Sequence, residues 1–158
     1  MSFETLTVAK YIYQTLSGDA TLTSLLAGGK APGFQIGVYQ EMAPTIDPKS
    51  GKEPVLPYIV FSRVGSWEPL GNALCGGTHV SYPTYRVTVW HEQSGSISYA
   101  RVQSIADRIT TLLDGQKVTL DGLDFASLRL DTEQPIIVGT DGHIDYGLTV
   151  VYGFTVTF

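Results

Sequence analysis

The chain has 158 residues, of which 43% are hydrophobic and nine are tyrosines, so length and composition favour one folded domain, residues 1–158, over a disordered chain. Fifteen acidic against ten basic residues give a formal net charge of −5, the wrong sign for holding nucleic acid through a basic patch. The lone Cys75 excludes an internal disulfide and a cysteine-rich zinc site.

Two helices are predicted at the start of the chain. Ser2 is a candidate N-cap for the first, which should end near Gly18. Its expected inward positions follow helical spacing: Phe3, Leu6, Ala9, Tyr13 and Leu16. Asp19 is placed to cap a second, short helix over residues 20–26. That helix should gather its leucines on one side: Leu22, Leu25 and Leu26.

A short strand over residues 36–39 leads into a long loop, residues 41–57, which carries four prolines and almost no periodicity. Loops of this length in compact domains are usually functional or disordered. We therefore predict an arm that contacts other proteins, and the alternative is a mobile excursion with no partner. The candidate contacts in the arm are charged: Asp47, Lys49, Lys52 and Glu53.

The next segment alternates strands and a glycine-rich loop. Residues 58–64 are rich in β-formers, and residues 85–90 alternate apolar with polar side chains, so both predict strands. Residues 65–83 between them predict a second long loop. In it, Trp67 and Leu74 place large apolar side chains on a flexible backbone, which suits docking onto a partner. The alternative for Trp67 is that it folds back over the sheet.

A strongly amphipathic helix is predicted after the strand at 85–90, with Ser96 as N-cap and Gly115 as its stop. Apolar residues recur in it at steps of three and four. They form one stripe: Tyr99, Val102, Ile105, Ala106, Ile109, Leu112 and Leu113.

The last third of the chain predicts a hairpin and a long final strand. Asp121-Gly122, between residues 117–120 and 123–130, is a strong signal for a two-residue turn. From Tyr146 onward, alternate apolar residues mark one face of a strand that ends at Phe158. A strand of this length must bend at Gly147 or Gly153 or continue beyond its own domain. We expect it to overhang and to offer a free edge to a neighbour, with Phe158 among the contacts.

Motifs for catalysis are weak. Residues 71–78 have the glycine spacing of a phosphate loop but lack its lysine. Two groups could hold a metal ion on paper: Asp141, His143 and Asp145, and Cys75, His79 and His91. A turn and its flanks explain the first group more simply. We expect no catalytic residue, no cofactor and no metal, and a small metal-dependent enzyme using Asp141, His143 and Asp145 stays as the rival hypothesis.

Together the elements predict an α+β fold: an antiparallel β-sheet with two main helices packed on one face, long loops and an added hairpin over residues 123–138. Several parts of the chain follow one another in a particular order: residues 19–26, 38–39, 43–44, 57–61 and 85–90, and then the helix with Ala106-Asp107 and Leu112-Leu113. This order resembles that of the tail terminator or tail completion proteins of long-tailed bacteriophages and gene transfer agents.

This resemblance implies a virion protein of the tail or neck that forms a homohexameric ring on the tail tube, stops tube growth and offers a surface to the head–tail connector. The implied partners are further copies of the chain, the tube protein and the connector or stopper protein. DNA would pass through the lumen without specific binding, and the acidic balance suits this because it repels phosphate. A head-side neck stopper or adaptor is the alternative.

No apolar run approaches the roughly 18 residues of a membrane span, and no signal peptide is evident, so we expect assembly in the host cytoplasm without a membrane.

Overall fold

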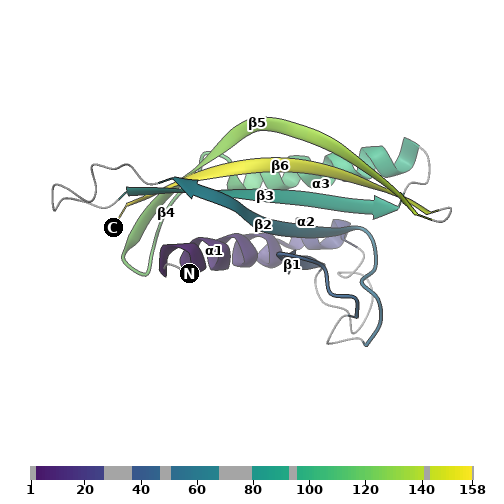
Figure 1. The fold of residues 1–158 in the computed structure, drawn as a ribbon, viewed down its shortest axis with the longest axis horizontal. Helices are drawn as coiled ribbons and strands as arrows, with labels where there is room; N and C mark the ends of the chain where they lie inside the picture. The colour runs from purple at the N-terminus through teal and green to yellow at the C-terminus, as the bar shows by residue number, and fades with distance from the viewer. Residues whose placement is uncertain are drawn as a thin grey trace.

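The computed structural model describes residues 3–26, 37–46, 51–67, 80–92, 96–140 and 143–157. These residues form a six-stranded sheet and three helices (Figure 1). The elements follow in the order α1 (Phe3–Gly18), α2 (Ala20–Leu25), β1 (Val38–Gln40), β2 (Tyr58–Trp67), β3 (Val80–Glu92), α3 (Ser96–Leu113), β4 (Lys117–Leu120), β5 (Leu123–Thr140) and β6 (His143–Thr157).

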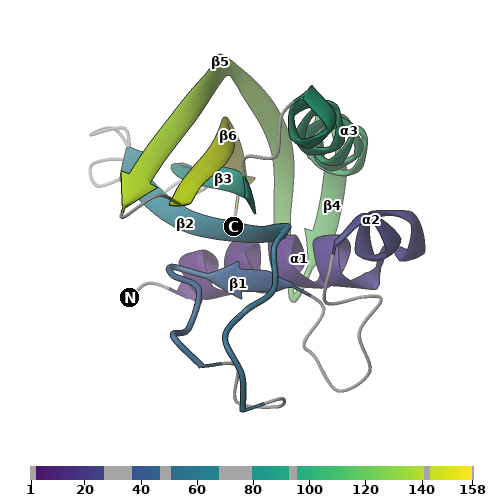
Figure 2. The same cartoon turned by 90° about the vertical axis from the view of Figure 1, so that its right-hand side faces the viewer.

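The strands lie in the order β1-β2-β3-β6-β5-β4, and every neighbouring pair is antiparallel except β1 with β2. The sheet is curled: Figure 2 shows β5 bending over β6 and β3. The register between β5 and β6 shifts between Leu130 and Glu133, an irregularity of the kind that increases the local bend and twist of a strand. The predicted α+β class, with two main helices and a mostly antiparallel sheet, is confirmed.

One continuous core lies between the helices and the inner face of the sheet. Its centre is aromatic: the ring of Phe154 meets those of Tyr85 and Phe125 edge-on, at centroid distances of 5.8 and 6.3 Å. Burial raises the pKa of Tyr85 to about 12, so this phenol stays neutral at physiological pH. The alternation predicted for the last strand is confirmed, since its even-numbered residues are buried: Leu148, Val150, Tyr152, Phe154 and Val156.

The inward stripe of α1 differs from the prediction. Val8 and Ile12 are fully buried, whereas Leu6 is 60% exposed and Tyr13 is also exposed. Both sets have helical spacing with Ala9 and Leu16 in common, and the helix is rotated so that the set with Val8 and Ile12 meets the core. The stripe predicted for α3 is buried or partly buried except at its first member, Tyr99, which is exposed.

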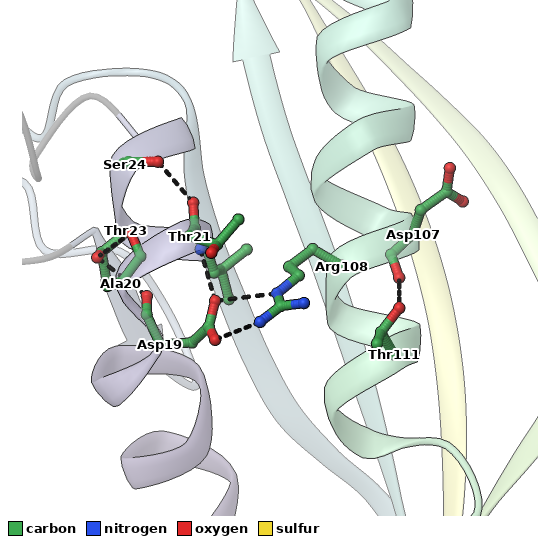
Figure 3. A network of polar contacts seen from close by, with 9 residues as sticks. Asp19, Ala20, Thr21, Thr23, Ser24, Asp107, Arg108 and Thr111 are labelled. Carbon is green, nitrogen blue, oxygen red and sulfur yellow. Dashed lines mark hydrogen bonds and ion pairs between the residues drawn. The ribbon is translucent and has the colours of Figure 1, made fainter.

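The short helix α2 is fastened at both ends to α3. Asp19 caps it as predicted, because its Oδ1 accepts a hydrogen bond from the backbone N–H of Leu22 at 2.7 Å. Arg108 of α3 donates two hydrogen bonds to the same carboxylate, as Figure 3 shows. At the other end, Arg101 donates from Nε and Nη2 to the carbonyl oxygen of Leu25.

The predicted free edge of the last strand is wrong. β6 lies inside the sheet, paired with β3 along one side and with β5 along the other.

The loop predicted over residues 65–83 is also wrong at both ends. Gly65, Ser66 and Trp67 belong to β2 and pair with Thr84, Pro83 and Tyr82 of β3. Residues 68–79 lie outside the described residues.

The hairpin predicted around Asp121-Gly122 is confirmed. β4 pairs with the first residues of β5, and Asp121 and Gly122 have φ values of 51° and 77°. Positive φ at both central positions is what a tight type I′ turn requires. The added hairpin predicted over residues 123–138 is wrong, because this range lies within the single strand β5, which pairs with β4 only at its start and with β6 along most of its length.

Candidate assembly surfaces

The loop between β1 and β2 projects beyond the β1 edge of the sheet (Figures 1 and 2). We call its described parts, residues 41–46 and 51–57, the arm. Met42, Ile46 and Val55 are exposed on it, with Met42 at 74%. Lys52 and Glu53, two of the predicted contacts, are exposed in the arm as well. Exposed apolar side chains among charged ones are typical of a surface that binds another protein.

A second apolar surface lies on β5, near the opposite edge of the sheet. It consists of Leu128 and Leu130, which face outward, and we call it the β5 patch. Ile137 and Val138, further along β5, are also exposed, but Ile137 pairs with Tyr146 and therefore lies on the other face of the sheet. Leu128 is 62% exposed and Leu130 39%, so these residues contribute little to the core. Apolar exposure concentrated on one strand is more informative than scattered single residues.

Beside the β5 patch, the outer face of the sheet carries a pocket of about 240 Å³. Its described lining residues come from three neighbouring strands: Arg86, Gln134, Ile136, Thr149 and Val151. Arg86 is the charged member of this set and is exposed, and no described carboxylate forms an ion pair with it. The described lining therefore combines two aliphatic side chains and two neutral polar ones with one cation.

A buried polar pair forms part of the same outer face. The hydroxyl groups of Thr88 on β3 and Thr149 on β6 are 2.9 Å apart and share a hydrogen bond. Gly147, the next outward position on β6, lets Trp90 lie against the strand, since a Cβ there would be 3.2 Å from the indole ring. A second, open pocket of about 360 Å³ lies where β4, β5 and β6 meet, with Lys117 and Asp124 among its lining residues.

The other predicted contact residues are placed less fully. Asp47, Lys49, Leu74 and Phe158 lie outside the described residues. Trp67 ends β2, and its backbone is described but its side chain is not. The structure therefore places Lys52 and Glu53 side by side on the arm. The docking role of all seven predicted contact residues stays a prediction.

The two candidate metal sites lie almost entirely outside the described side chains. His143 and Asp145 are described only as backbone partners of Thr140 and Val138 in the β5–β6 ladder, and Asp141, Cys75 and His79 lie outside the described residues. His91 is half-buried on β3, where burial, with a smaller effect of Arg101, lowers its pKa. No group of three metal-ligating side chains occurs among the described residues. None of the helices in this part of the chain is long and apolar enough to cross a membrane.

Comparison with known proteins gives the class of the protein. Residues 10–140 match the model of a family of structural proteins of the virion tail, and this match spans most of the chain. The chain belongs to that family, described as tail completion protein gp17. The resemblance seen in the sequence is therefore confirmed, and the protein is a virion component of the tail.

A solved structure has a similar fold. It is a chain described as "Virion of native gene transfer agent (GTA) particle", with a TM-score of 0.63 and 16% sequence identity. The match covers 93% of this chain and 92% of that one. At this identity it shows a common fold and no more. No curated protein sequence matches the chain.

Sequence reasoning missed the β5 patch and the apolar residues of the arm. Leu128 and Leu130 share a period of two with the residues of a buried strand, so the pattern alone could not show that they face outward. Met42, Ile46 and Val55 do carry a signal, since with Leu56 they are the large apolar side chains of a largely polar, proline-rich segment.

Proposed function

We propose that this tail completion protein caps the end of the tail tube as a homohexameric ring, stops tube polymerisation and forms the surface to which the head-side connector binds. The observation that carries the proposal is the family match over residues 10–140. The similar fold found in a gene transfer agent virion is consistent with it.

The proposed mechanism is geometric and noncovalent. A tube grows because each added ring offers the face that the next ring binds. A terminator matches the tube through one face, and its other face differs from that of a tube subunit, so growth stops. Because no bond is made or broken, this role needs no catalytic residue, cofactor or metal. The net charge of −5 also suits a ring that DNA crosses, since an acidic wall does not retain phosphate.

Particles made without the protein test this function. We expect tails of uncontrolled length and heads that carry no tail, both visible by negative-stain electron microscopy, and we expect the protein supplied in trans to restore normal tails. Its position at the tube end can be read from labelled protein in the same images.

The result also separates the proposal from the neck-stopper alternative. Tails of normal length that fail to join heads would overturn the terminator role and favour a head-side stopper. Normal particles without the protein would overturn both.

A further inference from the structure

We propose that the arm of one copy docks on the β5 patch of the next copy, so that the subunits contact one another head to tail. This inference rests on the proposed function, because docking of the arm on the patch supplies the contact between subunits of the proposed ring. The arm is residues 41–46 and 51–57, and the patch with its adjoining pocket lies on β5 and the outer face of the sheet.

The first support is that both surfaces carry exposed apolar side chains. Met42 and Ile46 on the arm and Leu128 on the patch are each more than half exposed, and Leu130 on the patch is 39% exposed. Burying such side chains against each other contributes about 25 cal/mol per Å² of apolar area removed from water. A pocket of about 240 Å³ beside the patch has room for one large side chain of the arm.

The second support is the position of the two surfaces. β1 and β4 are the outermost strands of the sheet, the arm follows β1, and β5 adjoins β4. Figures 1 and 2 show the arm beyond the β1 edge, on the side of the sheet away from β5. Two complementary surfaces at opposite edges of one molecule join different copies head to tail, and such contacts form a ring when the rotation closes.

The third support is charge. The described arm carries Glu41 and Glu53 against Lys52, a net charge of −1, while the described pocket lining carries Arg86. An arm carboxylate is therefore attracted to the pocket, which favours this pairing over contact between two arms or two patches. The occupant we infer is a second copy of this chain, and the tube and connector proteins are the other outcomes of the test.

Strand pairing between copies is disfavoured at this edge. β4 covers β5 only from Leu123 to Ala126, so the rest of β5 is an outer strand, but Pro135 within it has no N–H to donate. The bulge between Leu130 and Glu133 interrupts the ladder further. Contact therefore depends on the side chains of the patch.

The test uses the full chain and two double variants, Met42→Asp/Ile46→Asp on the arm and Leu128→Asp/Leu130→Asp on the patch. Analytical ultracentrifugation should show association weakened about tenfold or more in each, since charges are placed in an apolar contact. Leu6→Asp on α1 is the matched control, because Leu6 is 60% exposed and lies on neither surface; it should associate as the unaltered protein does. Circular dichroism checks that each variant is folded.

Mixing the two double variants gives the decisive result. Each retains the surface that the other has lost, so an equimolar mixture should form dimers but no rings, because one intact contact remains in each pair. Association that survives both double variants, or a mixture that stays monomeric, would overturn the inference. So would an unaltered protein that is monomeric at every concentration, or an arm that binds isolated tube or connector protein instead. The proposed function is judged separately, by tail length.

Discussion

Arg108 in α3 holds both carboxylate oxygens of Asp19, with its Nε 3.0 Å from Oδ1 and its Nη2 2.6 Å from Oδ2. The two residues are 89 positions apart in the sequence, yet the same Oδ1 also accepts the N–H of Leu22 at the start of α2. Asp19 therefore serves as N-cap and as a tie between two helices. The hydrogen bond from Arg108 is the main cause that lowers the pKa of Asp19 below its ordinary value of 3.8.

Acid should weaken this tie. Because the pKa of Asp19 is lower in the folded protein, its contribution is present above the ordinary value of 3.8 and is lost as the pH falls through the folded pKa. Asp19→Ala should lower the free energy of unfolding by about 1 kcal/mol at neutral pH through loss of the cap. Urea denaturation at neutral pH and in acid should show the difference between the two proteins shrinking in acid. An equal difference at both pH values would contradict the prediction.

The hydroxyl pair on the outer face of the sheet allows a double-mutant cycle. Thr88→Val or Thr149→Val alone should cost about 1–3 kcal/mol, because each leaves a buried hydroxyl without its partner. The double variant should cost less than the two single changes together, since no such hydroxyl is then left. Thr155→Val, at another outward position of β6, is the control and should change stability little. Additive single changes would show that the pair is not coupled.

Two glycines on β6 should respond differently to alanine. At Gly147 a Cβ would lie 3.2 Å from two carbon atoms of Trp90, whereas at Gly153 the closest atom would be at an ordinary 3.7 Å. Gly153→Ala should be neutral or stabilising by about 0.5 kcal/mol, because alanine loses less backbone entropy on folding. Gly147→Ala should be less stable than Gly153→Ala by about 1 kcal/mol. Thermal denaturation of the two variants compares them directly, and equal melting temperatures would contradict the close approach of Trp90.

We also predict that the purified protein carries no stoichiometric metal. The cluster of Asp141, His143 and Asp145 is explained by a turn and its flanks, so His143→Ala with Asp145→Ala should change the free energy of unfolding by no more than about 0.5 kcal/mol. Elemental analysis for zinc and manganese, before and after the double change, provides the measurement. Bound metal that disappears in the variant would favour the metal-dependent enzyme.

Local signals predicted the local structure of this chain well. The cap at Asp19, the turn at Asp121-Gly122 and the alternation along β6 each depend on a few neighbouring residues, and the structure confirms all three. Which stripe of α1 faces inward is less local. Leu6 with Tyr13, and Val8 with Ile12, both have helical spacing, and only packing against the sheet selects between them.

Strand order and surface apolarity could not be read from the same patterns. A period of two shows that one face of β6 is buried, but it does not say which strands flank it, so the wrong prediction of a free edge followed. Gly65 reads as a loop residue in sequence, yet its pairing with Thr84 continues β2 past an irregularity after Arg63. The β5 patch was missed because outward apolar residues on a strand resemble core residues.

The place of β6 in the sheet has a consequence for synthesis. β3 and β5 both pair with β6 and not with each other, so the sheet is split into two ladders, β1-β2-β3 and β4-β5, until β6 has left the ribosome. The aromatic centre around Phe154 is likewise completed by this strand. A nascent chain therefore cannot close its core early, and the order of strands delays the finished fold until the segment through Thr157 has been made.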